Sequence, residues 1–257
     1  MISNLDIINI SHYYLAGLFF VIAFVYSSVG LGGGSSYTAL MAVFGMNTLE
    51  IPMISLTLNL FATSVGSYNF IRNNHAKLKL ILPFLITSIP MAYVGGALKV
   101  SKEIFYWILL ASLVLVAARM YLWENTTLKI NLGQVGKLII SLFIGSILGL
   151  IAGIVGIGGG IYLVPIIIIL GLGTEKEAAA CGAIFIWINS LSGLIARLQY
   201  NSIDLTSYIP LISAVLIGSA LGSFMGSFKY SPKTMQRILG IIIIIAISLL
   251  TRKILLI

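Results

Sequence analysis

The chain has 257 residues, of which 59% are hydrophobic and only 9% are charged. A soluble domain carries about 25% charged residues, so this composition, with a mean hydropathy of +1.09, excludes a water-soluble globular protein. The net charge of +8 does not indicate nucleic-acid binding, because Lys and Arg lie in short loops between apolar stretches, as they do in the cytoplasmic loops of membrane proteins. We therefore expect an all-α integral membrane protein whose main partner is the lipid bilayer.

Ten apolar stretches follow one another along the chain: 10–29, 35–46, 51–71, 78–98, 104–123, 137–155, 160–171, 178–198, 208–227 and 235–257. Eight of them approach the roughly 20 residues that a helix needs to cross the hydrocarbon core. The other two, 35–46 and 160–171, have about a dozen residues, or roughly 18 Å of helix. Each of these short stretches directly follows a glycine cluster.

The two glycine clusters mark an internal duplication. GLGGG at 30–34 matches GIGGG at 156–160 at a shift of 126 residues. Further pairs follow in the same order at a shift of 127, namely Gly66 with Gly193, Asn74 with Asn201, Pro83 with Pro210 and Gly95 with Gly222. Such ordered landmarks predict two membrane repeats, 1–123 and 138–257, joined by a polar linker at 124–137.

The distribution of charges bears on the orientation of the repeats. We expect each repeat to have a Gly-broken helical hairpin plus three spanning helices. If each glycine cluster is the tip of a hairpin, or if both of its arms cross the membrane, each repeat crosses an odd number of times and the two repeats are inverted. The Lys and Arg residues then divide ten to five between the two sides, whereas parallel repeats divide them nine to six. The positive-inside rule favours inversion. Inversion also places both termini outside, an awkward position for Arg252 and Lys253.

The glycines fall into two classes. Those spaced by four residues form one helical face and predict close helix packing; they are Gly145, Gly149, Gly153, Gly218, Gly222 and Gly226. The clusters at 30–34 and 156–160 differ, because four glycines in five residues occupy every side of a helix. Irregular backbone survives in a membrane only where it is buried in protein or lines a wet cavity, and breaks at matching positions of two repeats indicate a transporter's binding site. A hinge or packing role remains the alternative.

A helix that begins after such a break presents unpaired N–H groups and the positive end of its dipole, which suits an anion. Polar residues on the next long stretch of each half share a helical face at four-residue spacing. The predicted substrate-binding residues are Gly32, Gly33, Gly34, Ser35, Ser36, Asn59, Thr63, Gly158, Gly159, Gly160, Asn189, Ser190 and Arg197. Asn and Ser also fit interhelical hydrogen bonding, and Arg197 fits snorkelling to an interface as well as ligand contact or an electrostatic gate.

Several kinds of chemistry are disfavoured by what the apolar stretches lack. No Asp or Glu falls in the middle of a stretch, and proton relays and many divalent-cation sites in membranes use such carboxylates. This argues against a cation antiporter or a metal transporter. The two histidines and the one cysteine do not form a metal-binding pattern, and no lysine follows the glycines as in an ATP-binding loop. We expect no enzyme activity, no cofactor and no metal.

Together the duplicated clusters resemble the TauE/SafE sulfite exporter family, also called the toluenesulfonate uptake permease family. Pro165 after the second cluster and the starts of the last stretches, SKE at 101–103 and SPK at 231–233, belong to that pattern, which runs over nearly the whole chain. The first half departs from it, since Ala39 stands at the position that matches Pro165.

The resemblance implies a secondary transporter in the bacterial inner (plasma) membrane, a multi-pass exporter that moves sulfite, organosulfonates or other small anions by alternating access. The motif positions would bind this small anionic substrate at 30–34 and 156–160. An anion channel of the same fold and a non-transporting membrane partner subunit remain alternatives, and assembly into a homo-oligomer stays open.

Overall fold

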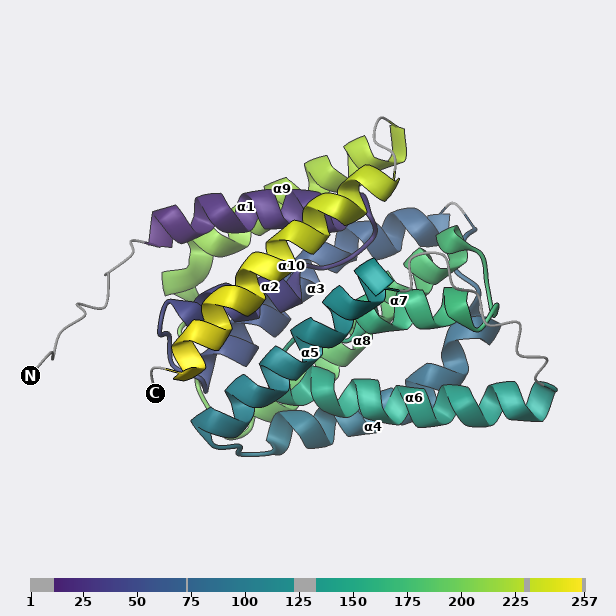
Figure 1. Cartoon of the computed structure of the whole chain (residues 1–257), viewed down its shortest axis with the longest axis horizontal. Helices are drawn as coiled ribbons and strands as arrows, with labels where there is room; N and C mark the ends of the chain where they lie inside the picture. Colours follow the sequence, from purple (N-terminus) through teal and green to yellow (C-terminus); the bar gives the residue numbers. More distant parts are fainter. Residues whose placement is uncertain (1–11, 73, 123–132, 229–231, 256–257) are drawn as a thin grey trace, which may run out of the picture.

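The computed structural model describes residues 12–72, 74–122, 133–228 and 232–255. Every regular element among them is a helix (Figure 1), which confirms the predicted all-α class. The helices are α1 His12–Ser28, α2 Gly34–Val43, α3 Glu50–Arg72, α4 Leu78–Ala97, α5 Lys102–Leu122, α6 Gln134–Val155, α7 Gly160–Ile169, α8 Glu175–Leu198, η1 Leu205–Tyr208, α9 Ile209–Phe228 and α10 Pro232–Leu255. Within the described ranges, five helical segments are long and apolar enough to cross a membrane: α4, α6, α8, the η1–α9 segment and α10.

The two glycine clusters break the chain where they were expected to. The first separates α1 from α2, and the second separates α6 from α7. Helices α2 and α7 have 10 residues each, or about 15 Å at 1.5 Å per residue. Neither is long enough to cross the hydrocarbon core alone.

The predicted linker is partly helical. Residues 123–132 lie outside the described residues, and α6 begins at Gln134. The last four residues of the expected linker, 134–137, therefore form the first turn of α6, with Gly133 at the N-cap position.

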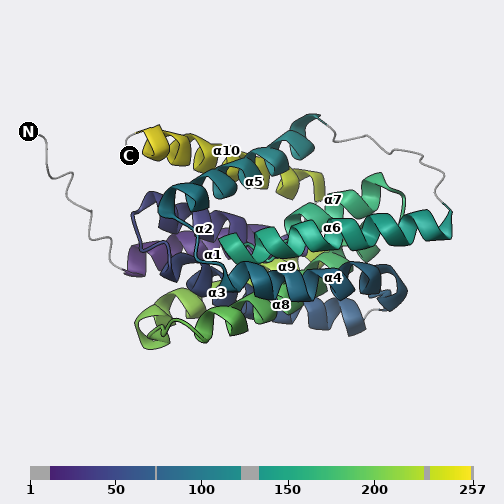
Figure 2. The ribbon, with the colours of Figure 1, turned by 90° about the horizontal axis from the view of Figure 1, so that it is seen from below.

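Helices α3 and α8, the long helices that follow the two breaks, run in opposite directions. Gly30 lies between Phe70 near the end of α3 and Ala179 near the start of α8. The middles of the two helices are joined by Trp187, whose indole N–H donates to Ser64 Oγ at 3.0 Å. The start of α1 and the end of α10 lie at one end of the molecule, whereas α6 starts at the opposite end (Figures 1 and 2).

Contacts at the two ends fix this arrangement. At one end, Lys77 before α4 forms an ion pair with Glu177 in the first turn of α8. At the other, Tyr208 donates to Glu50 at the start of α3 over 3.1 Å. Lys253 near the end of α10 donates to the Ala42 and Val43 carbonyls at the end of α2, over 2.6 and 3.0 Å.

The glycines spaced by four residues pack helices from different parts of the chain together. Gly145, Gly149 and Gly153 on α6 lie so close to α4 that an added Cβ would collide with its carbonyl oxygens. Gly218 and Gly222 on α9 lie equally close to carbonyl oxygens of α1. These contacts confirm the predicted packing role, and Gly226 lies outside the residues whose contacts are described. Helix α6 thus packs along α4, and α9 along α1.

Candidate substrate site at the two helix breaks

The two breaks share a backbone conformation that requires glycine. Gly33 and Gly159, the N-cap residues of α2 and α7, have φ of 92° and 80°, in the left-handed region that other residues rarely adopt. Gly30 and Gly156 have φ of 79° and 81° at the other end of each break. In the first turns, the Ser36 and Tyr162 N–H groups donate to the N-cap carbonyls of Gly33 and Gly159 at 3.0 and 3.2 Å. The N–H groups of the two residues before each of them have no intrahelical acceptor.

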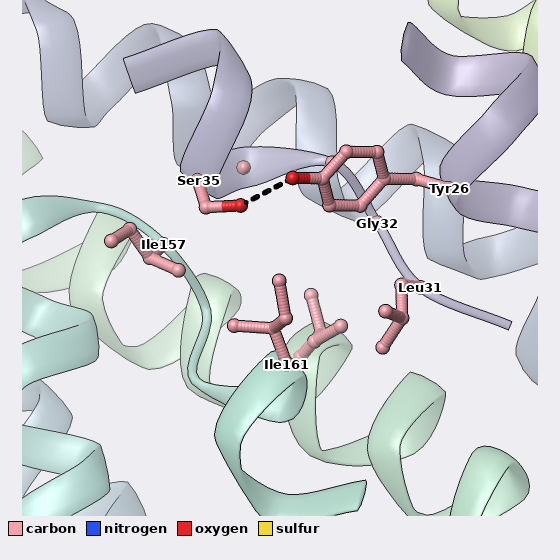
Figure 3. A pocket seen from close by; sticks show the side chains of 9 residues that line it. Tyr26, Leu31, Gly32, Ser35, Ile157 and Ile161 are labelled. Atoms are coloured by element: carbon pink, nitrogen blue, oxygen red, sulfur yellow. Dashed lines mark hydrogen bonds between the residues drawn. The ribbon is translucent and has the colours of Figure 1, made fainter. Parts of the chain in front are cut away.

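The two breaks meet in the interior. A Cβ on Gly34 would lie 2.8 Å from the carbonyl oxygen of Ile157, so the start of α2 touches the second break. Between them lies a cavity of about 10 Å³ (Figure 3), which holds about one water molecule. Its lining residues are Tyr26, Leu31, Gly32, Gly33, Gly34, Ser35, Ile157, Ile161 and Ile186.

One wall of this cavity carries hydroxyl groups. Tyr26, in the last turn of α1, has its hydroxyl 2.8 Å from Ser35 Oγ and 2.7 Å from Ser36 Oγ (Figure 3 shows the Ser35 contact). All three side chains are buried. Ser35 and Ser36 were predicted as site residues and lie there, whereas Tyr26 was missed. Its only signal in the sequence is its place one turn before the first break.

Helix α3 ties the two breaks together through two residues one turn apart. Ser55 Oγ lies 2.8 Å from the Gly156 carbonyl and 3.2 Å from the Gly34 carbonyl, so it can donate to either break. Asn59 Nδ2 donates to the Ile157 carbonyl at 3.2 Å. Asn59 was predicted, but Ser55 was missed, although it lies four residues before Asn59 on the same helical face.

Asn59 also lies directly against the first break. Its Oδ1 has no N–H or O–H partner among the described residues. This oxygen lies 2.8 Å from the positions that a Cβ on Gly32 or Gly34 would take, so it faces their Cα–H groups, a weak contact. Only glycine allows the amide to fit at these positions.

The remaining predicted side chains differ in what they reach. Ser190 Oγ lies 3.0 Å from the Cβ position of Gly158, in the second break. The Thr63 methyl group lies 2.9 Å from the Cβ position of Gly32, while its hydroxyl donates within its own helix. Asn189 donates to the Phe185 carbonyl at 2.9 Å, also within its own helix. Ser190 and Thr63 therefore border the breaks, whereas no described contact joins Asn189 to them.

Arg197 supports the second break from the end of α6. Only 5% of this residue is exposed, and its Nη2 donates to the Gly153 and Ile154 carbonyls at 2.8 and 2.7 Å. These carbonyls belong to the last turn of α6, where helix carbonyls lack partners and a positive charge is favourable. Arg197 is not among the residues that line the cavity. Its predicted role as a gate stays a prediction.

Broken helices that meet at a buried cavity, among apolar helices of membrane-spanning length, are typical of membrane transporters. The sequence matches the family model described as sulfite exporter TauE/SafE over residues 15–250, and the chain belongs to that family. This confirms the family that the glycine motifs indicated.

The chain is similar to several curated proteins. It is 30% identical over 236 residues to the probable membrane transporter protein y4hK of Sinorhizobium fredii, covering 90% of this chain and 95% of that protein. It is 26% identical over 252 residues to the probable membrane transporter protein MJ0441 of Methanocaldococcus jannaschii, covering 87% and 89%. The probable membrane transporter protein YjnA of Bacillus subtilis is 24% identical over 252 residues, covering 90% and 96%. No solved structure matches the chain significantly.

Proposed function

We propose that this membrane transporter is a secondary exporter of small sulfur-containing oxyanions, such as sulfite or organosulfonates, in the inner (plasma) membrane. The observation that carries the proposal is the meeting of two helix starts at one buried cavity (Figure 3). Each start offers unpaired N–H groups and the positive end of a helix dipole, which stabilises an anion by about 0.3–2 kcal/mol, most where the site is buried. The cavity-lining residues are uncharged. An anion held only by neutral donors would bind weakly enough to be released.

Alternating access is proposed from the arrangement of the helices. The long helices α3 and α8 run antiparallel, and the glycine faces pair α1 with α9 and α6 with α4. These relations support two inverted repeats. The first helix of each repeat, α1 or α6, packs against a helix of the other repeat, α9 or α4. In such transporters one repeat rocks against the other around a site near the middle of the membrane.

The charge distribution supports one orientation. Lys77 and Lys176 lie at the end where α4 and α8 begin, with most of the other basic residues assigned to that side. Lys99 and Lys253 lie at the opposite end. By the positive-inside rule, the end with Lys77 would face the cytoplasm.

The thermal stability of the purified protein tests the proposal. It would be measured at constant ionic strength with sulfite, sulfate, propane-1-sulfonate, acetate and choline. A ligand at about 100 times its Kd stabilises the folded state by about 2.7 kcal/mol, which raises the Tm of a chain of this size by about 5–10 °C. We expect a saturable rise with sulfite or the sulfonate and none with choline. No rise with sulfite or with propane-1-sulfonate would refute the proposed substrate class.

A further inference from the structure

We propose that the two breaks are not equivalent: the oxyanion group of the substrate binds at the first break alone, and the second break forms an apolar wall against the substituent on the sulfur. This inference rests on the proposed function, because it assigns parts of the same site. It selects organosulfonates with a short apolar group over sulfite as the preferred substrates.

Hydroxyl groups line the cavity from the first break. The second break has two buried hydroxyls without a partner among the described residues, Tyr162 and Ser190, but neither is among the residues that line the cavity. The Tyr26 hydroxyl at the end of α1 lies 2.8 Å from Ser35 Oγ and 2.7 Å from Ser36 Oγ at the start of α2. At the shift of 126 that relates the breaks, Ala152 stands in place of Tyr26 and Ile161 in place of Ser35. The second break therefore lacks the two hydroxyl groups that line the cavity at the first.

A fourth hydroxyl, that of Tyr37, lies at the first break. The Tyr37 side chain, in the first turn of α2, is fully buried. Its hydroxyl finds no hydrogen-bond partner among the described residues and lies 2.7 Å from the position of a Cβ on Gly33. Tyr37 does not itself line the cavity, but Gly33 does. Because buried hydroxyls are rarely left unpaired, we assign this hydroxyl as a donor to a ligand oxygen at the N-cap of α2. The residue that matches Tyr37 at the second break is Leu163.

Helix α3 occupies two carbonyl groups of the second break. The Gly156 and Ile157 carbonyls accept hydrogen bonds from Ser55 and Asn59 on α3. What the second half presents to the cavity is apolar, namely the side chains of Ile157, Ile161 and Ile186 (Figure 3 shows Ile157 and Ile161). Ile186 matches Asn59 at a shift of 127, so the second half carries an apolar group where the first carries an amide.

This division predicts which substituents bind. The cavity has room for about one water molecule, so a substituent enters as the breaks move apart and then faces the three isoleucines. Each methylene buried there strengthens binding about four-fold. An ammonium group at the same place would lose its hydration without gaining an ion pair, because no Asp or Glu is among the described residues that line the cavity. Propane-1-sulfonate and taurine, which differ only by a methyl and an ammonium group, isolate this effect.

Paired variants test the location of the oxyanion. The Kd of propane-1-sulfonate would be measured by calorimetry for the wild-type protein, Ser35→Ala, Tyr37→Phe and, as the matched control at the second break, Tyr162→Phe. Hydrogen bonds to charged groups make the expected loss ten-fold or more for the first two variants, and less than two-fold for the control. Tyr37→Phe should keep its ligand-free Tm, because the removed hydroxyl has no hydrogen-bond partner among the described residues.

The ligand series tests the apolar wall on the wild-type protein. We expect propane-1-sulfonate to bind at least ten-fold more tightly than taurine and more tightly than sulfite. Equal losses in Tyr37→Phe and Tyr162→Phe, no loss in either first-break variant, or tighter binding of taurine would each overturn the inference. A wild-type protein that binds none of these anions would instead refute the proposed function.

Discussion

A methyl group added at Gly34 tests how closely the two breaks are held together. Gly34 has an ordinary helical φ and stands at the first position of α2, so Gly34→Ala introduces no backbone strain. The new Cβ would lie 2.8 Å from both Asn59 Oδ1 and the Ile157 carbonyl, and it would collide with Asn59 Nδ2. The methyl group therefore cannot enter unless Asn59 moves or the breaks separate.

The size of the effect follows from these contacts. Overpacking costs about 1–3 kcal/mol, and displacing Asn59 leaves the buried Ile157 carbonyl without its donor at about 1–3 kcal/mol. The helix propensity of alanine offsets at most about 1 kcal/mol. The net loss is about 2–4 kcal/mol, which lowers Tm by roughly 5–15 °C in a chain of this length.

Thermal unfolding of the purified protein measures this loss. Gly17→Ala is the matched control, because Gly17 is an exposed residue of α1 with no atom within 4 Å of its Cβ position; its Tm should stay level or rise. The free energy of unfolding of the double variant Gly34→Ala/Asn59→Ala should fall by at least about 1 kcal/mol less than the sum of the two single losses. The reason is that the Asn59 amide, which the new methyl group would meet, is absent from the double variant. A Gly34→Ala protein as stable as Gly17→Ala would refute the close contact between the breaks.

Three further expectations concern the ends of the helices. In a Cys181→Ala background, a Lys99→Cys protein should react with an impermeant thiol reagent on intact cells, and a Lys176→Cys protein only after permeabilisation; the reverse pattern would refute the proposed orientation. Arg197→Met should lower Tm by roughly 5–15 °C and Arg197→Lys by less, because two buried α6 carbonyls lose their donor at about 1–3 kcal/mol each; an unchanged Tm would contradict the capping role. Hydrogen bonds from Thr206 and Ser207 lower the pKa of Asp204, so the carboxylate should add stability above its unfolded pKa of about 3.9 and lose it as pH falls through the lower folded pKa. The difference in Tm between the wild-type protein and Asp204→Asn should therefore vanish in acid, and a constant difference would contradict it.

The breaks could be predicted from the sequence because their cause is local. A backbone with positive φ at Gly33 and Gly159 needs glycine whatever surrounds it, so the pattern alone located the starts of α2 and α7. The packing glycines on α6 and α9 were predictable for a similar reason, since their four-residue spacing forms one face of a helix.

The partners of the polar side chains could not be predicted in the same way. Ser55 contacts the Gly156 carbonyl, which is 101 residues away along the chain. Arg197 was expected at an interface or at the ligand, yet it caps α6 through carbonyls 43 and 44 residues away. Such contacts depend on which helix ends meet, and single-residue patterns do not contain that information.

Counterflow in proteoliposomes is the most direct test of a transporter built around the two breaks. Vesicles preloaded with unlabelled propane-1-sulfonate would be diluted into a trace of ³⁵S-labelled propane-1-sulfonate, beside empty vesicles and vesicles that contain the Tyr37→Phe protein. Alternating access predicts a transient accumulation of label in the preloaded vesicles, saturable in external substrate and strongly reduced by Tyr37→Phe. Label that equilibrates equally with and without preloading would indicate an anion channel, and no protein-dependent uptake of this or any other sulfur oxyanion would contradict the proposed function.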